Sequence, residues 1–307
     1  MFSNLVENPK LFRHLAEDLP VGIYIVDRER RICFWNHGAE RITGRLSHDV
    51  VGHVVDDAMQ VCDRRGNSLR GEHCPVSMTL NLRKPQRCTA FSLHKNGHRT
   101  AVRIHTQPIL EYGNAIGGAT VMFEEVFAHR EESSGSTMYG CLDTNTGIPS
   151  RRLTRAVLSE CMAALEQSHI GFGLLRIRLL GMDDVRAQHG PQAVAPFLRT
   201  AANTLRHSLE AENFVGCWDE NEFLVVLISA SPMMVAMTGE VLCNLLNHSE
   251  VSWWGDRFPI AAEAAYTVAT AGTGLETLLR EMKPSHPMGT TKAVAAGAGD
   301  HAGRLRG

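Results

Sequence analysis

Val215-Gly-Cys-Trp-Asp-Glu-Asn-Glu-Phe-Leu-Val-Val-Leu227 is the stretch from which the fold can be predicted most directly. Residues 224–228 form a continuous apolar run rich in β-forming residues, which is typical of a buried strand. A shorter apolar run at 214–218 precedes it, so the pattern predicts two core strands joined by a polar turn at 219–222. A turn so rich in carboxylates is either a solvated hairpin tip or a site for a metal or phosphate group, and the residue types alone favour the solvated tip.

The same hairpin resembles the signature of the GGDEF family, the diguanylate cyclases, in which the turn reads Gly-Gly-Asp-Glu-Phe. Glu222 and Phe223 match that signature. Asp219 and Glu220 stand where the family has two glycines, and Asn221 stands where it has an aspartate. The chain keeps Glu222 and the apolar part of the signature and changes the rest of its polar part. We therefore interpret these five residues as a remnant in which no catalytic residue is expected.

A second motif, Cys141-Leu-Asp-Thr-Asn-Thr-Gly-Ile-Pro-Ser-Arg-Arg152, resembles the opening of the same domain, which reads Asp-x-Leu-Thr-Gly-Leu-x-Asn-Arg-Arg. The motif is long, so the resemblance does not depend on the hairpin alone. Periodic apolar residues predict helices at 153–167, 193–209, 233–246 and 275–282, and a strand at 258–269. The resemblance implies a GGDEF (nucleotidyl-cyclase-like) domain at 141–283, with a central sheet flanked by helices.

Residues 172–190 resemble the strand and helix that hold metal and nucleotide in this family. In a gapless alignment, Arg178 falls on the position of a metal-binding aspartate, and Arg186 falls on that of the asparagine that contacts guanine. The guanidinium of Arg178 could supply positive charge where a metal has been lost. Arg178, Arg186 and Glu222 are therefore the remaining candidates for nucleotide contacts.

A diguanylate cyclase joins two GTP molecules into cyclic di-GMP with the help of divalent cations. Mg²⁺ prefers hard oxygen ligands, which Arg178 lacks, and Asn221 offers one neutral amide oxygen in place of a carboxylate. Glycines let a backbone approach a ligand closely, whereas Asp219 and Glu220 add bulk and negative charge. We therefore expect a degenerate domain without catalysis, and Mg²⁺ only if the cyclase is active.

The first part of the chain follows a different pattern. Strands are expected at 21–26, 31–35, 102–108 and 115–123, and another ends at the Lys95-Asn-Gly97 turn. Asn36 is placed to cap a short helix. The order of these elements resembles a PAS domain, which implies a five-stranded antiparallel sheet with helices. The chain is thus expected to combine α/β and α+β architecture in two domains.

The expected boundaries are an N-terminal helix at 1–18, a PAS sensor domain at 19–126, a linker at 127–140, the degenerate GGDEF domain at 141–283 and a disordered tail at 284–307. PAS domains as a family hold haem, flavin or small metabolites between sheet and helices, and nothing in this sequence selects one of them. Cys62, His73 and Cys74 could meet around a metal or a haem iron. No pair of them has metal-site spacing, so buried thiols and a surface histidine are the favoured interpretation.

Bulk properties exclude several classes of protein. The formal net charge of −2 provides no basic surface for nucleic acid. No apolar run approaches the roughly 20 residues of a membrane span. The first residues lack the cationic and apolar regions of a secretory signal, and the eight cysteines contain no CxxC pair. We expect a cytoplasmic protein with reduced cysteines.

These observations favour a bacterial-type signal-transduction protein in which a PAS sensor is coupled to an inactive GGDEF domain. That domain would act as a regulatory or protein-interaction module in cyclic di-GMP signalling. The expected partner is a second copy of the chain, as a homodimer, or another signalling protein. One alternative is an active diguanylate cyclase with an atypical site. A second is a regulator that holds GTP or ATP without cyclising it.

Overall fold

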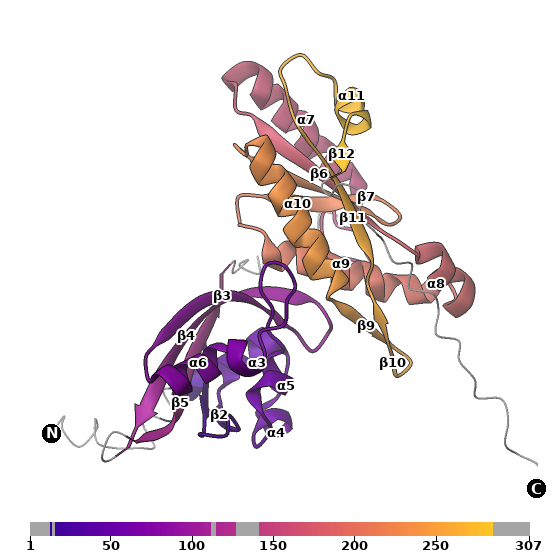
Figure 1. Ribbon diagram of the computed structural model, residues 1–307. Coiled ribbons are helices and arrows are strands. Elements are labelled where there is room, and N and C mark those ends of the chain that lie inside the picture. Colours follow the sequence, from indigo (N-terminus) through magenta and orange to yellow (C-terminus); the bar gives the residue numbers. More distant parts are fainter. Residues whose placement is uncertain (1–12, 14–15, 112–114, 127–140, 285–307) are drawn as a thin grey trace, which may run out of the picture.

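The computed structural model describes residues 13, 16–111, 115–126 and 141–284. Most of the expected N-terminal helix, the linker at 127–140 and nearly all of the expected tail lie outside the described residues. The described chain forms two units that follow one another in sequence (Figure 1). Each unit contains a five-stranded sheet and its own apolar core.

The first unit is built on an antiparallel sheet with the strand order β2-β1-β5-β4-β3. The strands are β1 (Gly22–Val26), β2 (Ile32–Trp35), β3 (Gln86–Leu93), β4 (Arg99–Leu110) and β5 (Ile116–Glu125). The helices are α3 (His37–Thr43), α4 (Ser47–Val50), α5 (Val55–Met59) and α6 (Pro75–Leu82), with a short 3-10 turn η1 (Gly71–His73). The sequence prediction of a five-stranded antiparallel sheet with helices is confirmed.

Asn36 connects the first helix to the sheet. Its Oδ1 accepts hydrogen bonds from the backbone N–H groups of Ala39, at 2.8 Å, and Ile23, at 2.7 Å. Its Nδ2 donates to the carbonyl of Val21 at 2.9 Å. The buried amide therefore caps α3, as the sequence predicts, and it also fixes the position of that helix against β1.

The second unit has the sheet order β12-β11-β6-β8-β7, and each neighbouring pair is antiparallel. Its strands are β6 (Phe172–Leu179), β7 (Phe214–Asp219), β8 (Glu222–Ile228), β11 (Ala262–Val268) and β12 (Lys283–Pro284). Its helices are α7 (Arg151–Ser168), α8 (Met182–His189), α9 (Val194–Ser208), α10 (Pro232–Asn247) and α11 (Leu275–Arg280), with a 3-10 turn η3 (Pro191–Ala193).

Helices cover both faces of this second sheet, which explains the continuous apolar run in β8. Val225 packs into a core formed with α9 and α10, whereas Leu224 and Val226 face the opposite core, which includes residues of α7 and α11. Since successive side chains of a strand point to opposite faces, a strand with both faces covered is apolar at every position. The predicted central sheet flanked by helices is confirmed.

The prediction of one strand at 258–269 is wrong. The segment is divided between β10 (Asp256–Pro259), which pairs with β9 (Glu250–Trp253) in a separate hairpin, and β11 in the central sheet. Pro259 has no backbone N–H to donate to a ladder, so it stands at the end of β10. None of the described helices is long and apolar enough to cross a membrane.

Candidate functional site

The hairpin between β7 and β8 is tighter than the sequence predicts. Asp219 is the last residue of β7 and pairs with Glu222, the first residue of β8, so the turn itself contains only Glu220 and Asn221. The Nδ2 of Asn221 donates to the carbonyl of Leu179 at 2.8 Å, and the N–H of Leu179 donates to the carbonyl of Asn221 at 2.9 Å. These two bonds hold the turn against the end of β6.

Glu222 is paired with an arginine inside the sheet. It lies directly opposite Arg178 in the register of β6 and β8. The Nε and Nη2 of Arg178 both contact the Oε1 of Glu222, at 2.7 and 2.6 Å. The side chain of Glu222 is 11% exposed and that of Arg178 is 46% exposed. The hydrogen bond to Glu222, and then the negative charges of Glu222 and Glu263, raise the pKa of Arg178 above its usual value.

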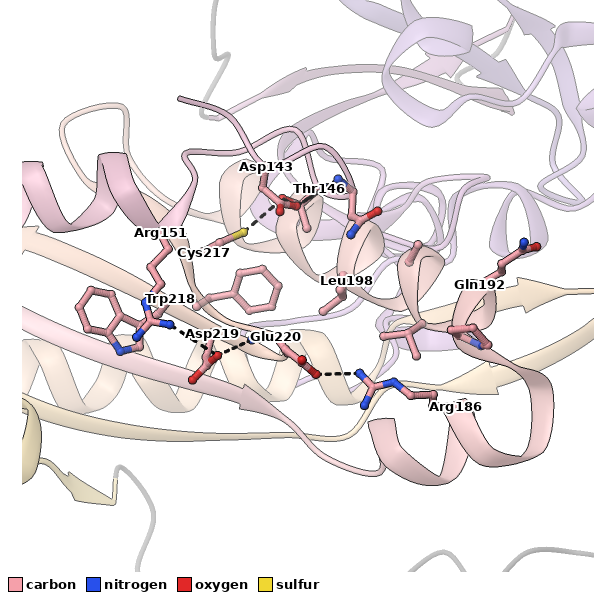
Figure 2. Close-up of a pocket in the computed structure, with 15 residues that line it drawn as sticks. Asp143, Thr146, Arg151, Arg186, Gln192, Leu198, Cys217, Trp218, Asp219 and Glu220 are labelled. Atoms are coloured by element: carbon pink, nitrogen blue, oxygen red, sulfur yellow. Dashed lines mark hydrogen bonds and ion pairs between the residues drawn. The ribbon is translucent and has the colours of Figure 1, made fainter. Parts of the chain in front are cut away.

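The two acidic residues at the tip are also matched by arginines. The Nη2 of Arg186 lies 2.9 Å from the Oε2 of Glu220, and the Nη1 of Arg151 lies 3.9 Å from the Oδ1 of Asp219 (Figure 2). The guanidinium of Arg151 also lies over the ring of Trp218, 5.5 Å from its centroid. Exposed ion pairs of this kind contribute at most about 1 kcal/mol each. They nevertheless reduce the repulsion between the tip carboxylates and an anionic ligand.

The motif at 141–152 forms a folded turn beside β7. The Oδ1 of Asp143 accepts hydrogen bonds from the N–H of Asn145, at 3.1 Å, and from the N–H and hydroxyl of Thr146, at 2.9 and 2.8 Å. The hydroxyl of Thr146 also lies 3.3 Å from the Sγ of Cys217 on β7. The carboxylate of Asp143 is therefore engaged in holding the turn together.

A cavity of about 770 Å³ lies between this turn, the hairpin and the start of α9 (Figure 2). Its lining residues are Asp143, Asn145, Thr146, Arg151, Arg186, Pro191, Gln192, Val194, Ala195, Leu198, Cys217, Trp218, Asp219, Glu220 and Phe223. Of the three residues predicted to contact nucleotide, Arg186 lines the cavity, whereas Arg178 and Glu222 pair with each other within the sheet. The volume lies within the range of small-molecule sites.

Most of the lining was missed by the sequence prediction. The wall contributed by α9 comes from Val194, Ala195 and Leu198. Val194 and Leu198 are four residues apart and share one helix face. That spacing is a signal for a buried face, but it does not say whether the face meets the core or a cavity. Arg151 belongs to the motif at 141–152, but its contact with Asp219 depends on the fold and is not predicted by the sequence.

A divalent cation does not fit the hairpin. The carboxylate of Glu222 is bound by the guanidinium of Arg178, so a cation at this point would meet a fixed positive charge at close range. Among the described residues, no group of three or more His, Cys, Asp or Glu side chains is placed to hold a metal.

The metal or haem candidates of the first unit are not brought together. Cys74 is buried in the core of the first unit, Cys62 belongs to a separate apolar cluster, and His73 is exposed. Burial raises the pKa of both thiols. The cavity beside Cys74, which Tyr24 and Asp56 also line, measures about 10 Å³. That is room for about one water molecule, so a haem or flavin does not fit this conformation.

Comparison with known families matches both units. Residues 10–126 match the family described as PAS fold, and residues 141–283 match the family described as diguanylate cyclase, GGDEF domain. No curated protein matches the chain at a significant level.

Several solved structures resemble part of the chain. Diguanylate cyclase SiaD from Pseudomonas aeruginosa, in complex with its activator SiaC, is 18% identical, with a TM-score of 0.44, and the match covers 45% of this chain and 54% of SiaD. The FimX GGDEF domain from the same species is 14% identical, with a TM-score of 0.44, and covers 46% of this chain and 88% of that one. A sensory box/GGDEF family protein from Caulobacter crescentus CB15 is 22% identical, with a TM-score of 0.41. The match covers 46% of this chain and 91% of that protein's chain.

Proposed function

The chain carries a PAS domain followed by a GGDEF domain of the diguanylate cyclase family, and from this premise we propose that it is a signalling protein whose GGDEF domain regulates without catalysis. The PAS domain would sense a signal or mediate dimerisation. The GGDEF domain would act within cyclic di-GMP signalling by contacting a second copy of the chain or another signalling protein.

The observation that carries this proposal is the ion pair between Arg178 and Glu222. Cyclase chemistry in this family depends on divalent cations that neutralise triphosphate charge. In this chain a guanidinium already neutralises Glu222, with nitrogen–oxygen distances of 2.6 and 2.7 Å. Two unit charges of the same sign 4 Å apart repel by roughly 4 kcal/mol near a protein surface. A divalent cation would have to displace the arginine, and Asn221 supplies no carboxylate to compensate.

The test is a cyclase assay on the purified full-length chain with GTP and Mg²⁺ or Mn²⁺. We expect no cyclic di-GMP. Product formed by the wild type and lost in Glu222→Ala would overturn the proposal, because activity would then belong to this hairpin. Product that persists unchanged in Glu222→Ala comes from a contaminating enzyme, and its removal by further purification leaves the expected null result.

A second candidate function is binding of GTP or ATP without turnover. The cavity of about 770 Å³ favours it, because Arg151 and Arg186 line this space beside apolar residues such as Leu198. Calorimetric titration of GTP into the protein, once with Mg²⁺ and once with EDTA, examines this function. Equal affinity under both conditions supports it, and the absence of heat under both conditions removes it.

A further inference from the structure

The PAS domain is packed directly against the GGDEF domain of the same chain (Figure 1). Strand β4 contacts α9, and residues of β3 and β4 share an apolar cluster with α10. The buried members of that cluster are Cys62, Phe91 and Ala101 from the PAS domain and Leu245 from α10. Val102 and Ala90 face the PAS core instead, so this contact uses the opposite face of the PAS sheet.

A buried arginine joins the two domains. Arg99, at the start of β4, is 8% exposed. Its Nη1 donates to the PAS carbonyls of Gln60 and Phe91, at 2.6 and 3.3 Å, and its Nε and Nη2 donate to the GGDEF carbonyl of His248, at 3.3 and 3.0 Å. Its backbone N–H donates to the Oγ1 of Thr204 on α9 at 3.2 Å. Because a buried charge is costly without partners, separating the domains would remove half of the bonds that satisfy this guanidinium.

The backbones of the two domains also meet closely. A β carbon on Gly97, in the turn before β4, would lie 1.8 Å from the carbonyl oxygen of Glu250 and 3.8 Å from the methyl group of Thr200. Gly97 has a φ of 89°, so its turn and its close approach both favour glycine. The close approach of the two backbones therefore leaves no room for a side chain at position 97.

Three stacked histidines cross the same interface. The rings of His94 and His98 have centroids 4.3 Å apart, and His98 lies 5.3 Å from His207 of α9. His98 is buried, and its Nδ1 has no hydrogen-bond partner among the described residues. Flat rings in contact extend the interface along α9 without introducing charge.

Helix α9 reaches from this interface to the cavity. Its C-terminal half presents Thr204 and His207 to the PAS domain, and its N-terminal half gives Val194 and Leu198 to the cavity wall. We propose that the PAS domain controls the GGDEF cavity directly, through α9, by docking onto the C-terminal half of that helix. The inference rests on the proposed function only in taking the PAS domain as a sensor that acts on the GGDEF domain. It requires neither nucleotide binding nor an inactive cyclase.

The experiment compares three variants of the full chain. Arg99→Ala removes the bonds from the PAS side, and Thr200→Arg places a long side chain against the Gly97 turn from the GGDEF side. Arg103→Ala is the control, because Arg103 lies on the same strand and pairs with Glu124 within the PAS domain, at 2.8 Å. Hydrogen–deuterium exchange of the backbone amides of residues 200–208, in the part of α9 that contacts the PAS domain, measures docking. The alkylation rate of Cys217 by iodoacetamide, resolved by peptide mass spectrometry, measures the state of the cavity that this thiol lines.

We expect both interface variants to raise exchange at 200–208 at least tenfold and to change the Cys217 alkylation rate at least threefold, while Arg103→Ala changes neither. Unchanged exchange in both interface variants would contradict docking. Raised exchange with an unchanged Cys217 rate would contradict control of the cavity. Thr200→Arg changes the GGDEF domain and Arg99→Ala changes the PAS domain. A result shared by both variants is therefore not explained by a local loss of PAS folding in Arg99→Ala. A positive cyclase assay would overturn the proposed function and leave this result intact.

Discussion

The position of Arg178 in the sheet places a positive charge beside the first residue of β8 in the hairpin. The register of β6 and β8 places it opposite Glu222, and Glu263 on β11 lies on its other side with its Oε1 3.5 Å from the Nη1. One arginine thus faces carboxylates from both neighbouring strands. The sheet itself therefore supplies the counter-charge for Glu222.

Removing this arginine should destabilise the GGDEF domain. Arg178→Ala leaves the carboxylate of Glu222, which is 11% exposed, without its main partner, and we expect a loss of about 1–3 kcal/mol in the free energy of unfolding. Urea unfolding followed by circular dichroism measures this loss. The control is Arg103→Ala, an exposed pair for which a change below about 0.5 kcal/mol is expected. Equal losses in the two variants would show that the Arg178 pair is an ordinary surface contact.

The resemblance in sequence places Arg178 where the family has a metal ligand, but it does not predict what the arginine contacts. The partner, Glu222, is 44 residues away in the chain, and the contact depends on the register of two strands. Register follows from packing and turn geometry, which a single sequence describes only weakly. The same limit explains why the ion pairs of Asp219 and Glu220 were not anticipated.

At the scale of elements, long apolar patterns are predictable and short exposed ones are not. Strand β8 and helix α9 are visible in the sequence because packing from neighbouring elements requires apolar residues at fixed intervals. The hairpin of β9 and β10 has short strands whose residues are mostly exposed or half-buried, so its pattern is weak. The clearest sign of this hairpin in the sequence is Gly255. It lies in the connecting turn, where its φ is 93°.

The cap of α3 by Asn36 should contribute to the stability of the PAS domain. Asn36→Ala removes an acceptor used by Ile23 and Ala39 and a donor used by Val21, all at a buried position. We expect a loss of about 2 kcal/mol in PAS stability, measured by chemical unfolding. Asn36→Ser keeps a neutral oxygen acceptor for the N–H of Ala39 and loses the amide donor to Val21, so it should lie between the wild type and Asn36→Ala. If Asn36→Ser is as unstable as Asn36→Ala, the capping bond to Ala39 is not the main contribution of this side chain.

At the scale of the whole molecule, the domain interface should respond to acid. Burial first, and then the neighbouring His207 and Arg45, lower the pKa of His94 to about 4. Burial, followed by His94, His207 and Arg206, lowers the pKa of His98 to about 2. In the unfolded chain both groups titrate near 6.5, so the unfolded state binds more protons below that pH. Stability is therefore fully present above about pH 6.5 and falls as the pH decreases towards 4.

His98→Phe tests this dependence because phenylalanine keeps a flat ring and cannot be protonated. For the buried His98, the loss in the wild type can reach about 1.4 kcal/mol for each unit of pH below 6.5. Urea midpoints at pH 7.5 and pH 5 give the slope for each protein, whatever the absolute stability of the variant. We expect a shallower slope in His98→Phe, and parallel slopes would show that the histidine stack does not control acid stability.

A titration of Mn²⁺ followed by electron paramagnetic resonance tests whether Arg178 takes the place of a divalent cation at Glu222. The signal of free Mn²⁺ would be recorded with GTP, in the presence and absence of the protein, and again with Glu222→Ala. We expect the wild-type protein and the variant to remove no more free Mn²⁺ than GTP alone does. Mn²⁺ held by the wild type and released in Glu222→Ala would contradict it.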